Sequence, residues 1–176
     1  DAIELNYSGI VFPHYFSVLK EGSLLDIVAN RFALRNGSIV LGVALGAFGG
    51  GAQITINAAD SIELTGANST TPNYITASSI AGDGAGGDIV VNTRRLLVAD
   101  GSQLESVTGG AGQGGDISIN ASERVDVVGK APTSTASAAE RVLLALGLQF
   151  DSTAMGHPSV SRIVATSWVE EVDSSW

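Results

Sequence analysis

The sequence GGDIVVN at residues 86–92 is one of three related copies in this chain. GAQITIN precedes it at residues 51–57, and GGDISIN follows it at residues 114–120. After each copy comes a second short apolar run and then a glycine, which is Gly66, Gly101 or Gly129. A single unit of this kind cannot bury its own apolar face and must stack on copies of itself, so the repeat predicts a solenoid.

The spacing of the copies indicates two kinds of coil. The asparagines that end the copies, Asn57, Asn92 and Asn120, lie 35 and 28 residues apart (92 minus 57, and 120 minus 92). Segments with closely similar sequence recur at about twice that distance, as in the 64 residues from Arg31 to Arg95 (95 minus 31). We therefore expect the chain to alternate two coil types, one of which has a turn one residue shorter.

Apolar and polar residues alternate within each copy. A period of two over short runs predicts strands with one buried face. We expect the outward positions to include Thr55, Glu63, Ser118 and Asp126. The residues expected to point inward are Ile54, Ile56, Ile62, Leu64, Ile89, Val91, Leu96, Val98, Ile117, Ile119, Val125 and Val127.

A third short strand per coil is expected at residues 74–78 and again at residues 103–107. No helical period of ten residues or more separates these strands, so each coil itself connects one parallel strand to the next. Three strands per coil predict an all-β fold, a right-handed parallel β-helix (solenoid), over residues 1–129.

The repeated polar and glycine residues have expected structural roles. An Asn at a corner between strands tolerates the left-handed conformation and can stack its amide on the Asn above and below. We expect Asn57, Asn92 and Asn120 to form such a ladder at equivalent corners, with a ligand role as the alternative. The glycines expected to adopt positive φ in turns are Gly86, Gly87, Gly114 and Gly115.

Residues 130–176 depart from the repeat. Residues 130–138 have loop composition, and residues 139–147 have the composition of a helix. We expect a short C-terminal helix that caps the stack, because the end of a solenoid must cover its exposed apolar layer. A degenerate coil with an inserted loop is the alternative. The run from Arg162 to Ala165 resembles the run from Arg95 to Val98, but we do not expect it to be a further copy.

Composition excludes several classes of protein. Hydrophobic residues make up 44% and charged residues 15% of the 176 residues, which is too apolar for a disordered chain. The net charge of -9 would repel a phosphate backbone, so no nucleic acid is expected as a partner. The absence of Cys excludes a disulfide scaffold and a thiol nucleophile.

Three stretches together resemble the repeat region of a known family. They are GGDIVVN at residues 86–92, RLLVADGSQL at residues 95–104 and GAGQGGDI at residues 110–117. They are similar to the repeat body of bacterial filamentous haemagglutinin-like exoproteins, the secreted partners of two-partner secretion systems. The resemblance implies a secreted or surface-attached filament with a structural or adhesive role. It also implies cell-surface glycans or proteins as partners, and an outer-membrane transporter for the full-length protein.

An enzyme is the first alternative, since polysaccharide-cleaving enzymes also use parallel β-helices. Asp88 and Asp116 occupy equivalent positions in neighbouring coils, with Arg94 and Arg95 as nearby cations. These carboxylates belong to the repeat itself, however, whereas a catalytic group is expected once, at one place. We expect no catalytic residues and no enzymatic activity.

A calcium-dependent module is the second alternative. Asp83, Asp88 and Asp116 lie in Gly-rich turns, and residues 109–116 partly resemble the turn of calcium-binding β-rolls. Calcium requires six to eight oxygen ligands, and each of these turns supplies one carboxylate. We therefore expect solvated turns, with no metal and no cofactor.

The remaining features concern the surface and the N-terminal end. Phe12, His14, Tyr15 and Phe16 would suit a sugar-stacking platform, but aromatic residues usually bury, and we expect core. Glycosylation acceptor patterns begin at Asn68 and Asn120. Residues 1–5 resemble the middle of a coil, so we expect a fragment of a longer array. Such a fragment is expected to self-associate through its N-terminal coil, or else to depend on the upstream coils that it has lost.

Overall fold

The computed structural model describes residues 1–6, 8–15, 24–45, 51–66, 72–80, 84–108, 111–130 and 162–167. These residues form ten β-strands and no helix. Of the described residues, none belongs to a helix long and apolar enough to cross a membrane. The expected helix at residues 139–147 lies outside the described residues.

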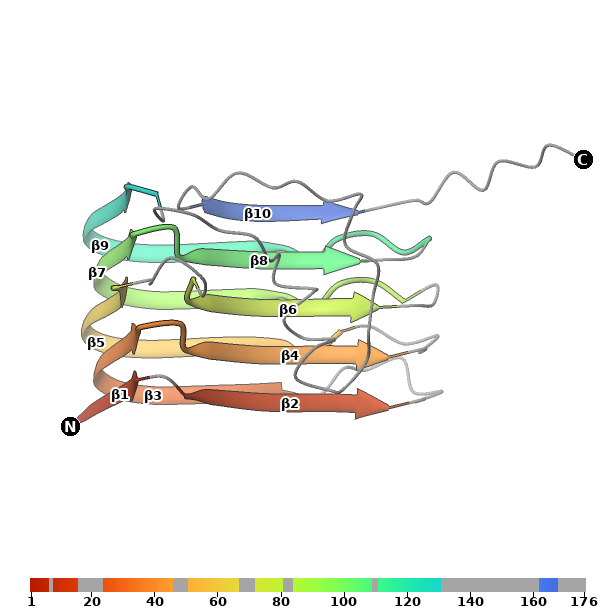
Figure 1. Cartoon of the computed structure of the whole chain (residues 1–176), viewed down its shortest axis with the longest axis horizontal. Coiled ribbons are helices and arrows are strands. Elements are labelled where there is room, and N and C mark those ends of the chain that lie inside the picture. The colour runs from red at the N-terminus through yellow and green to blue at the C-terminus, as the bar shows by residue number, and fades with distance from the viewer. Residues whose placement is uncertain are drawn as a thin grey trace, which may run out of the picture.

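The strands form two five-stranded sheets in which every pair is parallel (Figure 1). Sheet A contains, in spatial order, β1 (Ala2–Asn6), β3 (Leu24–Arg35), β5 (Gln53–Thr65), β7 (Ile89–Ala99) and β9 (Ile117–Val128). Sheet B contains β2 (Gly9–Tyr15), β4 (Ile39–Leu45), β6 (Tyr74–Ile80), β8 (Gln103–Thr108) and β10 (Arg162–Ser167). Odd strands lie in one sheet and even strands in the other, so the chain changes sheet after every strand. We call each odd strand and the even strand after it a repeat. The all-β prediction is confirmed.

The register between repeats follows the sequence copies. Asn57 lies opposite Asn92, and Asn92 lies opposite Asn120. The expected third strands are β6 and β8 of sheet B. The first two expected strands of each coil, however, form one continuous odd strand with a bend, because hydrogen bonding resumes directly beyond the bend. The observed architecture therefore has two sheets, where three strands per coil were expected.

The bend differs between successive repeats. One residue stands between the paired positions on β3 and β7, namely Asn30 and Arg94. Two residues stand there on β5 and on β9, where Ser122 and Glu123 occupy the bend of the last odd strand. The one-residue difference between the two versions of the sequence therefore lies at this bend.

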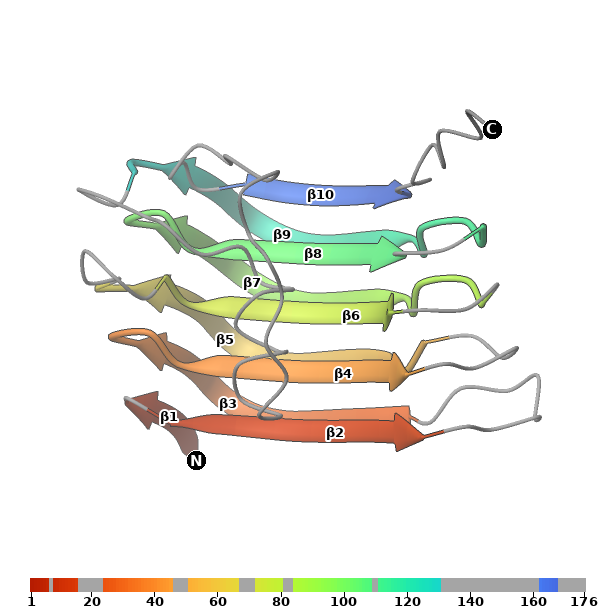
Figure 2. The ribbon, with the colours of Figure 1, turned by 45° about the vertical axis from the view of Figure 1, so that its right-hand side comes forward.

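The hydrophobic core lies between the two sheets, which face each other (Figure 2). The expected inward residues of β5 and β7 are all buried, and Ile117 and Ile119 of β9 pack partly against them. Sheet B contributes Val40, Ile75 and Leu104, among others. Val125 and Val127 lie in register with the buried Leu96 and Val98, as the inward prediction requires, but they are 47% and 41% exposed. They lie in β9, which has a described strand on one side only.

The glycines before the odd strands have a different role from the one expected. Positive φ occurs at Gly37, Gly66, Gly101 and Gly129, which follow the odd strands, and not at the expected Gly86, Gly87, Gly114 and Gly115. A Cβ on Gly87 would lie 2.0 Å from the carbonyl oxygen of Ala52, and one on Gly115 would lie 2.4 Å from the carbonyl oxygen of Gly87. Close stacking of backbones, not φ, requires glycine at these two positions.

The C-terminal strand belongs to sheet B. Arg162 lies opposite Gln103 of β8. Residues 162–165 are thus not the counterpart of residues 95–98 in sheet A, in agreement with the expectation. Residues 131–161, including His157, lie outside the described residues.

Candidate functional site: the outer face of sheet A

The outer face of sheet A bears a ladder of asparagines. Nδ2 of Asn92 donates to Oδ1 of Asn57 at 2.8 Å, and Nδ2 of Asn120 donates to Oδ1 of Asn92 at 2.8 Å. Nδ2 of Asn57 donates in turn to Oδ1 of Asp26 at 3.1 Å. The predicted stacking is confirmed, and the side-chain amides of successive asparagines hydrogen-bond to one another.

The expected corner position of these asparagines is wrong. All three lie within strands, and among described non-glycine residues positive φ occurs only at Asn36 and Asp100. Parallel strands in register place equivalent side chains about 4.8 Å apart, so the amides reach one another from ordinary extended backbone.

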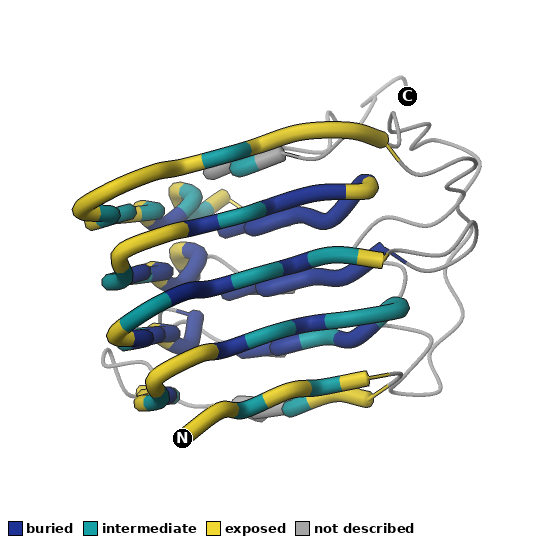
Figure 3. The backbone as a smooth tube through the Cα atoms, turned by 90° about the vertical axis from the view of Figure 1, so that its left-hand side faces the viewer, coloured by how far each residue is buried: buried dark blue, intermediate teal, exposed yellow. Residues whose placement is uncertain are grey.

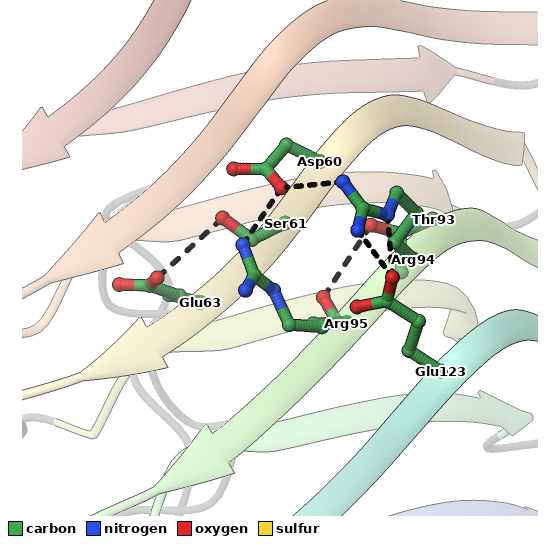
Figure 4. A network of polar contacts seen from close by, with 7 residues as sticks. All are labelled: Asp60, Ser61, Glu63, Thr93, Arg94, Arg95 and Glu123. Carbon is green, nitrogen blue, oxygen red and sulfur yellow. Dashed lines mark hydrogen bonds and ion pairs between the residues drawn. The ribbon is translucent and has the colours of Figure 1, made fainter.

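A charged network lies beside the ladder, at the bend of three successive odd strands (Figure 4). Asp60 Oδ1 of β5 accepts from Nη2 of Arg95 at 2.7 Å and lies 3.5 Å from Nη1 of Arg94. Arg94 also donates to Oε1 of Glu123 on β9, from Nε at 2.8 Å and from Nη2. The two arginines of β7 thus connect the repeats on both sides.

The network favours the charged form of Arg94. Its hydrogen bond to Glu123, together with the negative charge of that carboxylate, raises the pKa of the Arg94 guanidinium above its ordinary value. A base whose pKa is raised by folding stabilises the folded state. This stabilisation is fully present below the unfolded pKa and is lost only as pH rises through the folded pKa. The loss of this stabilisation is therefore confined to strongly alkaline solution, and it is present at all lower pH.

A second set of contacts lies further along the same face. Arg35 of β3 donates to Oγ1 of Thr65 at 2.6 Å and to Oε2 of Glu63 at 3.2 Å, both on β5. Its Nε lies 3.3 Å from Oε1 of Glu4 on β1. These side chains are at least one-third exposed, and such ion pairs are screened by solvent. They favour the observed register more than they add stability.

The structure brings together the two aspartates considered for catalysis, but not the arginines considered with them. The backbone N–H of Asp116 donates to Oδ1 of Asp88 at 2.8 Å, so this pair joins two repeats. Asp88 lies six residues before Arg94, which is about 20 Å along an extended chain. Arg94 and Arg95 pair instead with Asp60 and Glu123.

The turns considered for calcium show no cluster of ligands in the described ranges. Asp83 lies outside those ranges. Within them, no three His, Cys, Asp or Glu side chains lie close enough together to hold a metal ion.

The buried polar site at Asn73 was not predicted from the sequence. Asn73 is fully buried, and its Oδ1 accepts from the backbone N–H of Gly37 at 2.9 Å and of Ser38 at 3.0 Å. Its Nδ2 donates to the carbonyl oxygen of Thr65 at 3.0 Å and to Oγ of Ser102 at 2.9 Å. One amide thus connects three repeats. The Gly-Ser pairs at residues 37–38 and 101–102, 64 apart, were the available signal (101 minus 37).

The remaining candidates are only partly described. Phe12, His14 and Tyr15 lie in β2, where Phe12 is opposite Gly42 of β4, but their side chains are outside the described set. Phe16 and Asn68 are outside it altogether. Asn120, the other glycosylation candidate, belongs to the ladder.

Comparison with known proteins gives no relative from which a function could be transferred. No protein family, curated protein or solved structure matches the chain.

Proposed function

We propose that this chain is a segment of a right-handed parallel β-helix and serves as a non-catalytic structural or adhesive region of a larger exported bacterial protein. The observation that supports the proposal best is the Asn57–Asn92–Asn120 ladder. The most regular polar side chains on the outer face hydrogen-bond to their own counterparts in the next repeat. That is the arrangement expected of a surface built to extend by repetition.

The distribution of charge supports the same role. The acids and arginines at the bends pair with one another between repeats, as Arg94 does with Glu123. A catalytic centre requires an acid, a base or a nucleophile gathered in a pocket. An outer face whose side chains repeat at regular intervals would instead suit contact with extended partners, such as cell-surface glycans or proteins. On the basis of the resemblance to filamentous haemagglutinin-like exoproteins, we also propose secretion through an outer-membrane transporter and location at the cell surface.

A binding and cleavage experiment tests the functional part of the proposal. The purified chain is applied to a glycan array and to cells, and incubated with polysaccharides while reducing ends are measured. Binding without cleavage is expected. Release of reducing ends that disappears in both Asp88→Asn and Asp116→Asn would overturn the proposal in favour of a glycan-cleaving enzyme.

Thermal melts test the calcium alternative. The melting temperature is expected to be the same with calcium as with a chelator. A rise with calcium that Asp116→Asn abolishes, and Asp126→Asn does not, would favour the calcium-dependent module.

Crystallography tests the proposed handedness of the coil. A crystal structure of the chain is expected to show a right-handed path from each odd strand to the next. A left-handed path, or two sheets that belong to separate halves of the molecule, would contradict the β-helix.

A further inference from the structure

Among the described strands, β9 is the last of sheet A and has a neighbour along one edge only, as β1 does at the other end. β3, β5 and β7 each have a parallel neighbour on both sides, whereas among the described strands β9 pairs with β7 alone. An open edge presents backbone donors and acceptors that can pair with another chain.

Two side chains of this strand are exposed at positions that belong to the core elsewhere. Val125 and Val127 are 47% and 41% exposed. Their partners in register on β7, Leu96 and Val98, are 1% and 0% exposed. Figure 3 shows the same contrast between β9, the outermost strand of its sheet, and the dark blue segments of the strands before it. A further strand against β9 would return these valines to the environment that their position has in the other repeats.

The charges that flank Val125 favour a second copy of the same strand as the partner of β9. Arg124 and Asp126 lie on the same face of β9, since Nε of Arg124 is 2.5 Å from Oδ2 of Asp126. The sequence Arg-Val-Asp is self-complementary when the strand is paired with itself in the antiparallel sense about Val125. Arg124 of one copy then faces Asp126 of the other, twice, and the two copies of Val125 face each other.

We propose that β9 is a homodimer interface in which two copies of the chain pair antiparallel, centred on Val125. A two-fold axis perpendicular to the sheet keeps the inner faces on one side, so the valines of both copies meet beneath the joined sheet. Such an interface is isologous and closes at two copies. The inference does not depend on the proposed adhesive function.

Parallel stacking of a second copy is disfavoured by charge. Glu4, Ala33, Glu63, Leu97 and Asp126 are successive residues in one register column of sheet A. If β1 of a second copy continued the stack beyond β9 in this register, its Glu4 would lie beside Asp126. Like charges directly opposite each other destabilise strand pairing, whereas the antiparallel arrangement pairs opposite charges.

Charge-reversal variants of the whole chain test the proposal by sedimentation over a range of concentrations. The wild-type chain is expected to reach a dimer and no larger species. Arg124→Asp and Asp126→Arg each place like charges opposite each other twice, so each is expected to raise the dimer Kd by about tenfold or more. An equal mixture of the two variants restores both pairs and should form a mixed dimer with a Kd near that of the wild type. Glu4→Lys, at the opposite end of the stack, is the control and should leave dimerisation unchanged.

A disulfide test fixes the register and uses the absence of Cys from the chain. Directly opposed residues in an antiparallel pair have Cα atoms about 4.5–5.5 Å apart, which a disulfide can bridge. Val125→Cys is expected to form a covalent dimer under mild oxidation, whereas Val127→Cys is not. The proposal is overturned if the mixed charge variants do not associate, if Glu4→Lys prevents association, or if both cysteine variants cross-link equally.

Discussion

Replacement of Asn73 by Ala should destabilise this protein more than the loss of any amide in the outer ladder. The change removes the acceptor for the N–H groups of Gly37 and Ser38 and the donor to the carbonyl oxygen of Thr65. Each buried polar group left without a partner costs about 1–3 kcal/mol. Because the two N–H groups share one oxygen, we take the low end for each and expect a loss of about 3–5 kcal/mol in the free energy of unfolding.

The measurement is urea denaturation followed by circular dichroism, with Asn92→Ala as the matched control. Asn92 is half-buried, so water can replace its ladder bonds, and a loss of about 0.5–1 kcal/mol is expected. In a thermal melt, Asn73→Ala should lower the melting temperature by about 10 °C, given about 2–4 °C per kcal/mol in chains of this size. Equal losses in the two variants would refute the reasoning, because they would mean that burial does not distinguish the two amides.

Four further predictions concern the core, the glycine stack and, twice, the surface network. Leu64→Asp places an unpaired charge in the core and should abolish the cooperative melt, whereas Thr55→Asp on the outer face should keep it; a normal melt for Leu64→Asp would contradict the inward assignment. Gly87→Ala forces a Cβ to within 2.0 Å of a backbone oxygen and should cost about 3 kcal/mol or more in urea denaturation, and a neutral effect would mean that the adjacent backbones separate easily. Arg94→Gln removes the pair with Glu123 and should lower the melting temperature only slightly at low salt and not at all at high salt; a loss that persists in high salt would show that the network is not screened by solvent. No dependence of stability on pH from Arg94 is expected below strongly alkaline pH, because its pKa is raised.

The period of the sequence was sufficient to predict the repeats, their register and most of the core. Alternation of Ile54 and Ile56 with polar neighbours defines a buried face, and parallel pairing requires the same face in each copy. The Asn ladder followed from the same register. The exposed Val125 could not be predicted in this way, because its local pattern is that of a core residue and only its place in the stack differs.

Other features depend on contacts that a repeat pattern does not contain. The φ of Gly87 was predicted wrongly because a glycine required for space reads the same as a glycine required for a turn. Asn73 was missed because it occurs once, in the one repeat whose neighbours on both sides have Gly-Ser at this corner. The acids at the bend could be placed by register, but not their pairing with Arg94, since long side chains select among several neighbours.

The alternation of one-residue and two-residue bends has a consequence for how such a chain can lengthen. Arg94 stands alone at its bend and pairs with residues of the two-residue bends before and after it, Asp60 and Glu123. Insertion or deletion of a single repeat would put two bends of the same kind side by side and remove one of these pairings. Insertion of two repeats together would preserve every junction. The unit of duplication in the gene is therefore expected to encode a pair of repeats, the 64 residues that separate Arg31 from Arg95 (95 minus 31), and arrays of this kind should differ in length by even numbers of repeats.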